Sequence, residues 1–152
     1  MKTFKILFAL AFVALFASCS NDDDNNNDND IILSETEIPT QIMSYISEHF
    51  PDNAIVQAVQ DNDDNTVTYE VLLEGNFELD FNSDFEIIDI DGISALPDSV
   101  IPQAILDYVS ENYPDNYITD WKLELTHQQI ELNNGLELEF EMDGTFIRID
   151  ND

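Results

Sequence analysis

Basic residues are almost absent from this chain. Its 152 residues include four Lys and Arg against 33 Asp and Glu, which gives a formal net charge of −29. Binding of nucleic acid is therefore excluded on electrostatic grounds, because phosphate recognition needs a basic surface. The same imbalance favours cations, basic proteins and cationic peptides as partners. The other interpretation is that the charge keeps the protein soluble in a salty medium.

Residues that usually carry catalysis are also scarce. The chain has two His, one Cys and four Gly. His49 falls on an apolar helical stripe, where packing explains it better than ligation, and His127 has no second His or Cys at metal-binding spacing. The few glycines form no phosphate loop and no nucleophile elbow. We expect no catalytic residues, no cofactor and no metal. A hydrolase, the remaining enzymatic alternative, would need a deep pocket around one of the two histidines.

The N-terminus carries an export signal. Lys2 and Lys5 precede an apolar run over 6–16, which is too short to span a bilayer and has the form of a secretory segment. Small residues then precede Cys19, which resembles a bacterial lipobox, where the chain is cut before the cysteine and its thiol is diacylated. We predict a signal peptide over 1–18 and a lipid on Cys19 that holds the protein on a membrane. The alternative is an ordinary signal peptide with an unrelated cysteine.

Ten consecutive Asp and Asn residues follow at 21–30. They offer no apolar surface to offset the entropy of ordering, so we predict a disordered tether over 19–35. An acidic patch directly after a lipidated cysteine resembles the export signal of some lipoproteins of the outer membrane. We therefore expect a location at the bacterial outer membrane, at the cell surface rather than on the periplasmic face.

The rest of the chain contains an internal sequence repeat. Residues 38–55 return at 101–118 without a gap, each copy with Ile-Pro at its start and Pro-Asp-Asn near its end. Apolar residues at spacings of three and four predict one helix per copy, and alternating residues after it predict four short antiparallel strands. We expect an α+β fold of two tandem repeats, 36–92 and 93–152. Each is one helix plus a four-stranded antiparallel sheet, with the helices packed on one face of the combined sheet.

Acidic residues occupy the positions between the apolar residues of these strands, so they are expected on the sheet face opposite the helices. Like charges on neighbouring strands destabilise their pairing. The face is therefore either screened by salt or matched by a cationic partner. The candidate binding residues are Glu70, Glu78, Asp80, Glu124, Glu131, Glu137, Glu139 and Glu141, and Glu74 and Glu86 are expected on the same face.

Two further patterns have structural explanations. Residues 61–65 alternate oxygen-bearing side chains as a calcium loop does, but Thr66 and Leu72 occupy the sixth and twelfth positions, so the segment fails as an EF-hand and fits a polar hairpin turn. Tyr45, Tyr108 and Trp121 fit core packing of helix on sheet rather than a ligand cleft. Calcium remains a conceivable partner of the acidic residues.

Residues 130–150, together with Ile101-Pro102 and Tyr113-Pro114, resemble the PepSY-like lipoprotein family, whose fold is similar to the β-lactamase inhibitory protein. The resemblance covers about 36–151; the first copy matches less well, because 82–85 lacks the Asp-Gly of the last turn. It implies a helix and a four-stranded sheet in each repeat, with the two sheets side by side, and no established catalytic residues. For the inhibitory protein it implies a sheet presented to a partner, an analogy of shape alone.

We therefore expect a lipid-anchored, non-enzymatic envelope protein that binds a cationic protein or peptide through its acidic sheet face and loops. The alternative is a calcium-binding or cation-binding surface protein in which the acidic residues themselves are the functional groups.

Overall fold

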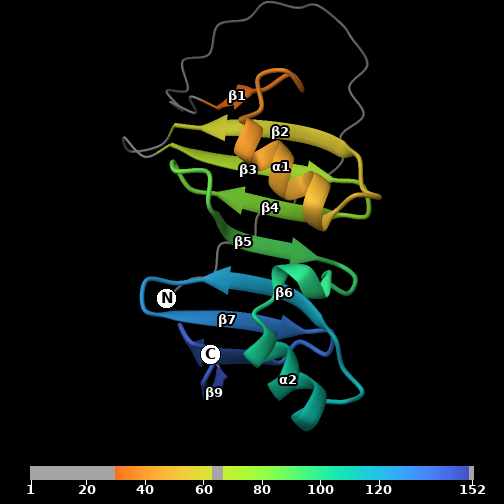
Figure 1. Cartoon of the computed structure of the whole chain (residues 1–152), viewed down its shortest axis with the longest axis vertical. Coiled ribbons are helices and arrows are strands. Elements are labelled where there is room, and N and C mark those ends of the chain that lie inside the picture. Colours follow the sequence, from red (N-terminus) through yellow and green to blue (C-terminus); the bar gives the residue numbers. More distant parts are fainter. Residues whose placement is uncertain (1–29, 63–66, 151–152) are drawn as a thin grey trace, which may run out of the picture.

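The computed structural model describes residues 30–62 and 67–150 (Figure 1). The predicted signal peptide, Cys19, most of the predicted tether and part of the rejected calcium loop lie outside the described residues. The strands are β1 (Ile31–Ile32), β2 (Ile55–Asp61), β3 (Thr68–Leu73), β4 (Phe77–Phe81), β5 (Ile87–Gly92), β6 (Ile118–Leu123), β7 (His127–Leu132), β8 (Glu137–Glu141) and β9 (Phe146–Asp150). The helices are α1 (Thr40–His49), α2 (Gln103–Asn112) and a short 3-10 helix, η2 (Asp98–Val100).

The strands form a single nine-stranded antiparallel sheet in the order of the sequence, β1 to β9. The predicted fold class, two repeats that each have a helix and their own four-stranded sheet, is therefore wrong. The two groups of four strands are continuous, and β1 adds a ninth strand beside β2. Residues 31–32, which fall within the range predicted as a tether, thus belong to the sheet.

The junction between β5 and β6 makes the sheet continuous. Asp89 pairs with Lys122, Ile90 with Trp121 and Asp91 with Asp120. Two separate sheets would each leave an edge strand with unpaired N–H and C=O groups, and pairing those edges satisfies both. The buried Ile90–Trp121 pair also extends one apolar layer across the junction.

Both helices cover the same face of the sheet (Figure 1). Pro39 and Pro102 directly precede them, where a missing N–H costs nothing. Each helix buries two residues against the strands, Ile42 and Ile46 in α1, and Ile105 and Val109 in α2. The structure confirms the predicted positions of the helices.

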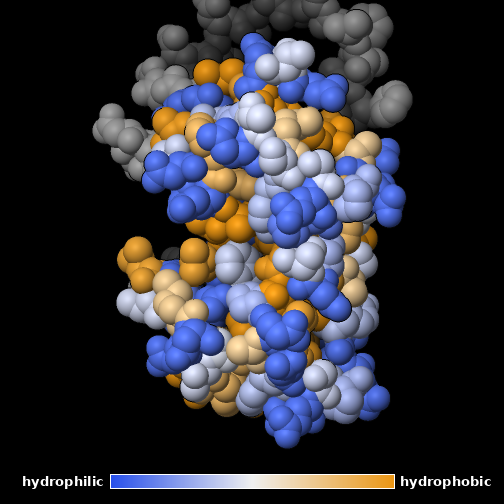
Figure 2. Space-filling model, in the orientation of Figure 1, coloured by the Kyte–Doolittle hydropathy of each residue, from blue (hydrophilic) through white to orange (hydrophobic). Residues whose placement is uncertain are grey.

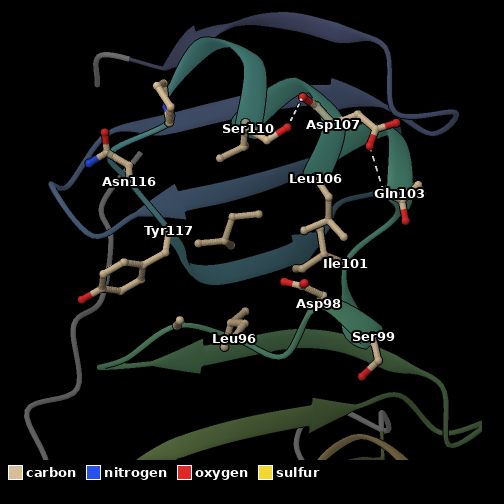
Figure 3. A pocket seen from close by; sticks show the side chains of 14 residues that line it. Leu96, Asp98, Ser99, Ile101, Gln103, Leu106, Asp107, Ser110, Asn116 and Tyr117 are labelled. Carbon is tan, nitrogen blue, oxygen red and sulfur yellow. Dashed lines mark hydrogen bonds between the residues drawn. The ribbon is translucent and has the colours of Figure 1, made fainter.

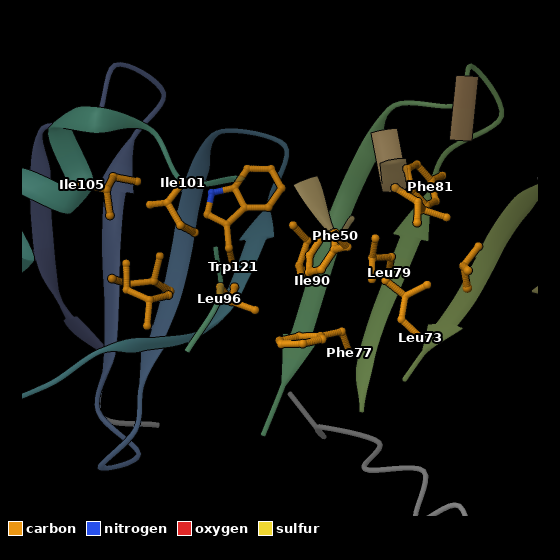
Figure 4. Packing of buried hydrophobic residues seen from close by; sticks show 14 of the residues in the cluster. Phe50, Leu73, Phe77, Leu79, Phe81, Ile90, Leu96, Ile101, Ile105 and Trp121 are labelled. Atoms are coloured by element: carbon orange, nitrogen blue, oxygen red, sulfur yellow. The ribbon is translucent and has the colours of Figure 1, made fainter. Parts of the chain in front are cut away.

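One hydrophobic core runs under both helices and across the junction, and Trp121 lies between Ile101 and Ile90 within it (Figure 4). Tyr45 packs edge-on against Phe81 with ring centroids 5.5 Å apart. Tyr108 packs against Phe140 in the same way at 5.4 Å. These equivalent contacts confirm that the aromatic residues serve core packing.

At the ends of β6 and β8, apolar residues of the predicted strand pattern lie outside the core. Strand β6 ends at Leu123, and Leu125 is 98% exposed in the turn that follows. Met142 is 53% exposed after the end of β8. The alternation continues beyond the last residues of β6 and β8, so the pattern overestimates the strand lengths there.

Candidate functional site

The face of the sheet opposite the helices carries acidic side chains. The register places Val71, Leu79, Ile90, Trp121, Ile130 and Leu138 in one cross-strand row, and all of them are buried in the core. Side chains of successive strand residues point to opposite faces, so the flanking rows lie on the other side. We call that side the open face. One of its two central rows consists of Glu70, Asp80, Asp89, Lys122, Gln129, Glu139 and Arg148. The other consists of Leu72, Glu78, Asp91, Asp120, Glu131, Glu137 and Asp150.

Most of the predicted binding residues lie on this open face. The strand positions that share it are Glu70, Glu78, Asp80, Glu131, Glu137, Glu139 and Glu141. Glu124 lies in the turn after β6, with its Oε1 atom 3.8 Å from Nζ of Lys122. Glu74 and Glu86 lie in turns outside the strands, so their expected place on the face is corrected.

Three central residues, Asp89, Asp91 and Asp120, were missed as binding candidates. Asp120 stands between Thr119 and Trp121, and the alternation of that strand already signals an outward position. Asp89 and Asp91 flank the buried Ile90, which gives the same signal of an outward position.

Like charges face each other directly at the centre of the open face. Asp80 pairs with both Glu70 and Asp89, and Asp120 pairs with Asp91 and Glu131. Burial raises the pKa of Asp80 to about 7, and the charges of Glu70 and Asp89 add to the effect. Burial followed by neighbouring carboxylates also raises the pKa of Asp120 to about 7. Near neutral pH, these groups are therefore only partly ionised.

Some carboxylate oxygens of this face are buried without hydrogen bonds. In the part of the chain that the structure describes, Oδ1 of Asp80 and Oδ1 of Asp61 have no hydrogen-bond partner. Such oxygens are uncommon in native proteins and call for a compensating group. Across residues 30–62 and 67–150, no group of three or more His, Cys, Asp or Glu residues is arranged to hold a metal ion.

Two basic residues compensate part of the charge. Nζ of Lys122 is 3.4 Å from Oδ2 of Asp89. Burial lowers the pKa of Lys122, but the attraction and hydrogen bond of Asp89 outweigh it and leave that pKa raised. Burial likewise leaves the pKa of Asp89 raised despite the lysine.

The second compensated position is near the C-terminal edge. Arg148 donates from Nε and from an Nη atom to the two oxygens of Glu139, at 2.7 and 2.6 Å. This paired hydrogen bonding holds the pKa of Glu139 below its usual range, although the residue is only 7% exposed. Acidic residues also face one another from β6 to β9 in the row of Asp120, Glu131, Glu137 and Asp150, so negative charge exceeds positive charge along the whole open face.

Each histidine lies beside one polar side chain of another element. Nδ1 of His49 is 2.9 Å from Oγ of Ser99, and its ring centroid lies 4.4 Å from that of Tyr45 in a tilted arrangement. Nε2 of His127 is 3.8 Å from Oε1 of Glu139, too long for a hydrogen bond. That carboxylate already accepts two hydrogen bonds from the arginine, so it is poorly placed to orient the imidazole.

The helix side has two shallow grooves at equivalent places in the repeats. One of about 660 Å³ lies beside α2, where Leu96, Leu106 and Ile101 form its apolar part and Asp98 its rim (Figure 3). The other, of about 510 Å³, lies beside α1 and includes Ile38, the counterpart of Ile101. Their repetition follows from the repeated packing of helix on strand.

Comparison with known proteins agrees with this architecture. The family model described as "Putative beta-lactamase-inhibitor-like, PepSY-like" matches residues 25–89 and again 91–148. The chain belongs to this PepSY-like family. It contains two tandem copies of the PepSY-like unit, as the repeat in the sequence predicts.

Solved structures similar to this PepSY-like protein come from Bacteroides. One is a "putative calcium-regulated periplasmic protein" from Bacteroides thetaiotaomicron, with 27% identity and a TM-score of 0.77; the match covers 81% of this chain and 98% of that one. Two periplasmic proteins from Bacteroides vulgatus have 30% and 28% identity and TM-scores of 0.76 and 0.75. Those matches cover 83% and 80% of this chain, and 100% and 99% of the respective relatives. Among curated proteins, none matches the chain. Within the described residues, no helix is long and apolar enough to cross a membrane.

Proposed function

We propose that this PepSY-like protein is a non-catalytic binding module whose open face takes up a cationic peptide or protein in the cell envelope. The pairing of like carboxylates across β3, β4, β5 and β6 carries the proposal. These pairs weaken the sheet, since like charges directly opposite each other are destabilising. Lys or Arg side chains of a partner would remove that repulsion, so part of the binding free energy comes from relief of strain in the free protein.

The N-terminal sequence and the relatives support a location in the cell envelope. The similar Bacteroides structures are described as periplasmic proteins. A lipid on Cys19 would keep this protein at the outer membrane, with the acidic segment as a tether that holds the open face away from the lipid. The description of the family supports an inhibitor-like role, in which the partner is an enzyme, by analogy of shape.

A matched pair of double variants tests the open face. Glu78→Gln/Asp91→Asn removes two exposed carboxylates that pair across β4 and β5. Glu48→Gln/Glu111→Gln removes the same charge from exposed positions of α1 and α2. Binding of a fluorescent oligolysine peptide is measured by anisotropy at two salt concentrations.

We expect the open-face variant to weaken binding about fivefold or more and the helix variant to weaken it by less than about twofold, because local pairing outweighs net charge at short range. Equal losses for both variants would show that the peptide responds only to total charge. The proposal would then be wrong.

Calcium binding is the second candidate function. The unpartnered Oδ1 of Asp80 among neighbouring carboxylates favours it, as does the calcium regulation named for one Bacteroides relative. Calcium prefers six to eight oxygen ligands, so strand side chains would have to move together to form such a site. If calcium binds specifically, millimolar calcium raises the melting temperature markedly, and sodium at the same ionic strength does not.

A further inference from the structure

The β6–β7 hairpin and the neighbouring turn after β8 carry exposed apolar side chains. Leu125 is 98% exposed, Met142 is 53% exposed and Leu123 is 36% exposed. We call these three residues the apolar tip. Apolar surface projects at the side of the molecule where Figure 1 places this hairpin (Figure 2). A large apolar side chain left almost fully in water contributes nothing to the folded core. The exposure of this apolar surface therefore needs another explanation.

The three residues lie together although they come from different hairpins. His127 pairs with Glu141, which brings the turn after β6 beside the turn after β8. Nε2 of Gln128 donates to the backbone oxygens of Glu141 and Met142, both at 3.2 Å. The tip is thus one surface feature built by two adjacent turns.

The first repeat has polar residues at the equivalent positions. The registers of β2–β3 and β6–β7 align Gln60 with Leu123 and Asn62 with Leu125. The equivalent hairpin hydrogen bonds Asn82 N to Glu86 O and Glu141 N to Thr145 O align Ser83 with Met142. The fold therefore accepts polar side chains at all three places, and the second repeat alone makes them apolar.

A buried network holds the tip in position. Gln128 is only 4% exposed, and its Oε1 accepts a hydrogen bond from Nε1 of Trp121 at 3.1 Å. With the two bonds from Nε2, its amide ties β6, β7 and the turn after β8 together. The first repeat has Ala58 at the position of Trp121 and Tyr69 at the position of Gln128, so it lacks this network. The apolar side chains are thus presented by a fixed support, which lowers the entropy cost of binding.

Acidic groups lie beside the tip at the same end of the sheet, although Leu123, two residues after the buried Trp121, belongs to the helix side and not to the open face. Glu124, Glu141 and Asp143 are its charged neighbours in sequence. Oε1 of Glu124 lies 3.8 Å from Nζ of Lys122, whose other partner is Asp89 at the centre of the open face. A ligand that covers the tip therefore meets apolar surface and negative charge at once.

We infer that the apolar tip binds apolar side chains of the same cationic partner, so that the partner is an amphipathic basic peptide or protein segment in which Leu-like residues alternate with Lys or Arg. This inference rests on the proposed function and adds the chemical class of the partner. The acidic rim opposes an anionic lipid surface and a second copy of this equally acidic chain, which leaves a basic segment as the complementary occupant.

Two peptides of equal length and charge test the inference, one of Lys and Leu and one of Lys and Ser. We expect the Lys/Leu peptide to bind the wild-type protein about tenfold more tightly, because the tip buries part of its apolar surface. Leu123→Gln/Leu125→Asn/Met142→Ser, which restores the residues of the first repeat, abolishes that preference and leaves affinity for the Lys/Ser peptide unchanged. The control variant Ile93→Ser changes an apolar residue that is 72% exposed but lies outside the tip, and it should keep the preference for the Lys/Leu peptide.

Each result separates the two levels of the account. If neither peptide binds, the proposed function fails. If both bind wild type equally, or if the tip variant keeps the preference, the open face still binds cations and the inference about the tip is overturned. Tip-dependent binding to phosphatidylcholine vesicles in the absence of peptide, or a tip-dependent dimer in sedimentation, would also overturn it. The single change Leu125→Asn, checked by thermal unfolding, repeats the test with minimal disturbance of the fold.

Discussion

Replacing Asp80 by Asn should stabilise the protein at pH 8 and do so clearly less at pH 5. The side chain stands between Glu70 and Asp89 on neighbouring strands. Its pKa is raised from 3.8 to about 7, mainly by burial and then by the neighbouring carboxylates. A carboxyl group with a raised folded-state pKa stabilises the protein fully below its unfolded pKa, and this contribution is lost as the pH rises through the folded pKa. The relevant window therefore runs from about pH 4 to pH 7.

The size of the effect follows from the same pKa difference. The shift of the pKa from 3.8 to about 7 corresponds to at most about 4 kcal/mol of lost stability above pH 7, which the Asn variant would recover. Because the residue is only partly buried and solvent screens the neighbouring charges, we expect about 1–2 kcal/mol. For a domain of this size, that is a rise in melting temperature of about 4–8 °C at pH 8.

Thermal unfolding gives the melting temperature and urea unfolding gives the free energy of unfolding, each measured at pH 5 and pH 8 for wild type and variant. Asp115→Asn, which removes an exposed carboxylate from the turn after α2, serves as the control and should change stability by less than about 0.5 kcal/mol at either pH. Destabilisation by Asp80→Asn at pH 8, or an equal effect at both pH values, would refute the repulsion at the centre of the open face.

Three further changes test other parts of the structure. Gly144→Ala should lower the free energy of unfolding by about 2–4 kcal/mol, because φ is +85° and the new Cβ would lie 2.6 Å from the Cβ atom of Ala104 in α2. Gly135→Ala, where φ is +79° and the space around the new Cβ is open, should lower it by only about 1 kcal/mol. Equal losses for the two variants in chemical unfolding would contradict the close packing of Gly144 against α2. Arg148→Ala should destabilise by about 1–2 kcal/mol, because it leaves the buried carboxylate of Glu139 without its paired hydrogen bonds; full retention of stability would show that water replaces them. Cys19→Ala should move the protein from the membrane fraction to the soluble fraction after ultracentrifugation, and continued membrane association would refute the lipid anchor.

The helices and the acidic face were predictable because their signals are local. The three-and-four spacing around Ile42 and Ile105 determines which side of each helix is buried. The strict alternation at Glu137, Glu139 and Glu141 likewise determines the side on which the acids lie. Both kinds of pattern read only neighbouring residues, and the structure agrees with them.

The continuous sheet was not predictable in the same way. Which edge strands meet depends on the path of the chain through α2, and no pattern within β5 or β6 records their pairing. The bidentate pair of Arg148 and Glu139 also depends on register between strands. For Leu125, the apolar alternation runs past the end of β6, so the pattern indicated a core position where the structure has an exposed turn. Comparison with the polar residues of the first repeat was the available signal.

Mapping by NMR of the oligolysine peptide on the uniformly labelled protein tests the central claim most directly. The account predicts that the largest chemical-shift changes fall on open-face positions of β3, β4, β5 and β6, around Asp80 and Asp120, and that they weaken as salt is raised. Shifts concentrated in the grooves beside α1 and α2, or spread evenly over all exposed acidic residues, would contradict it.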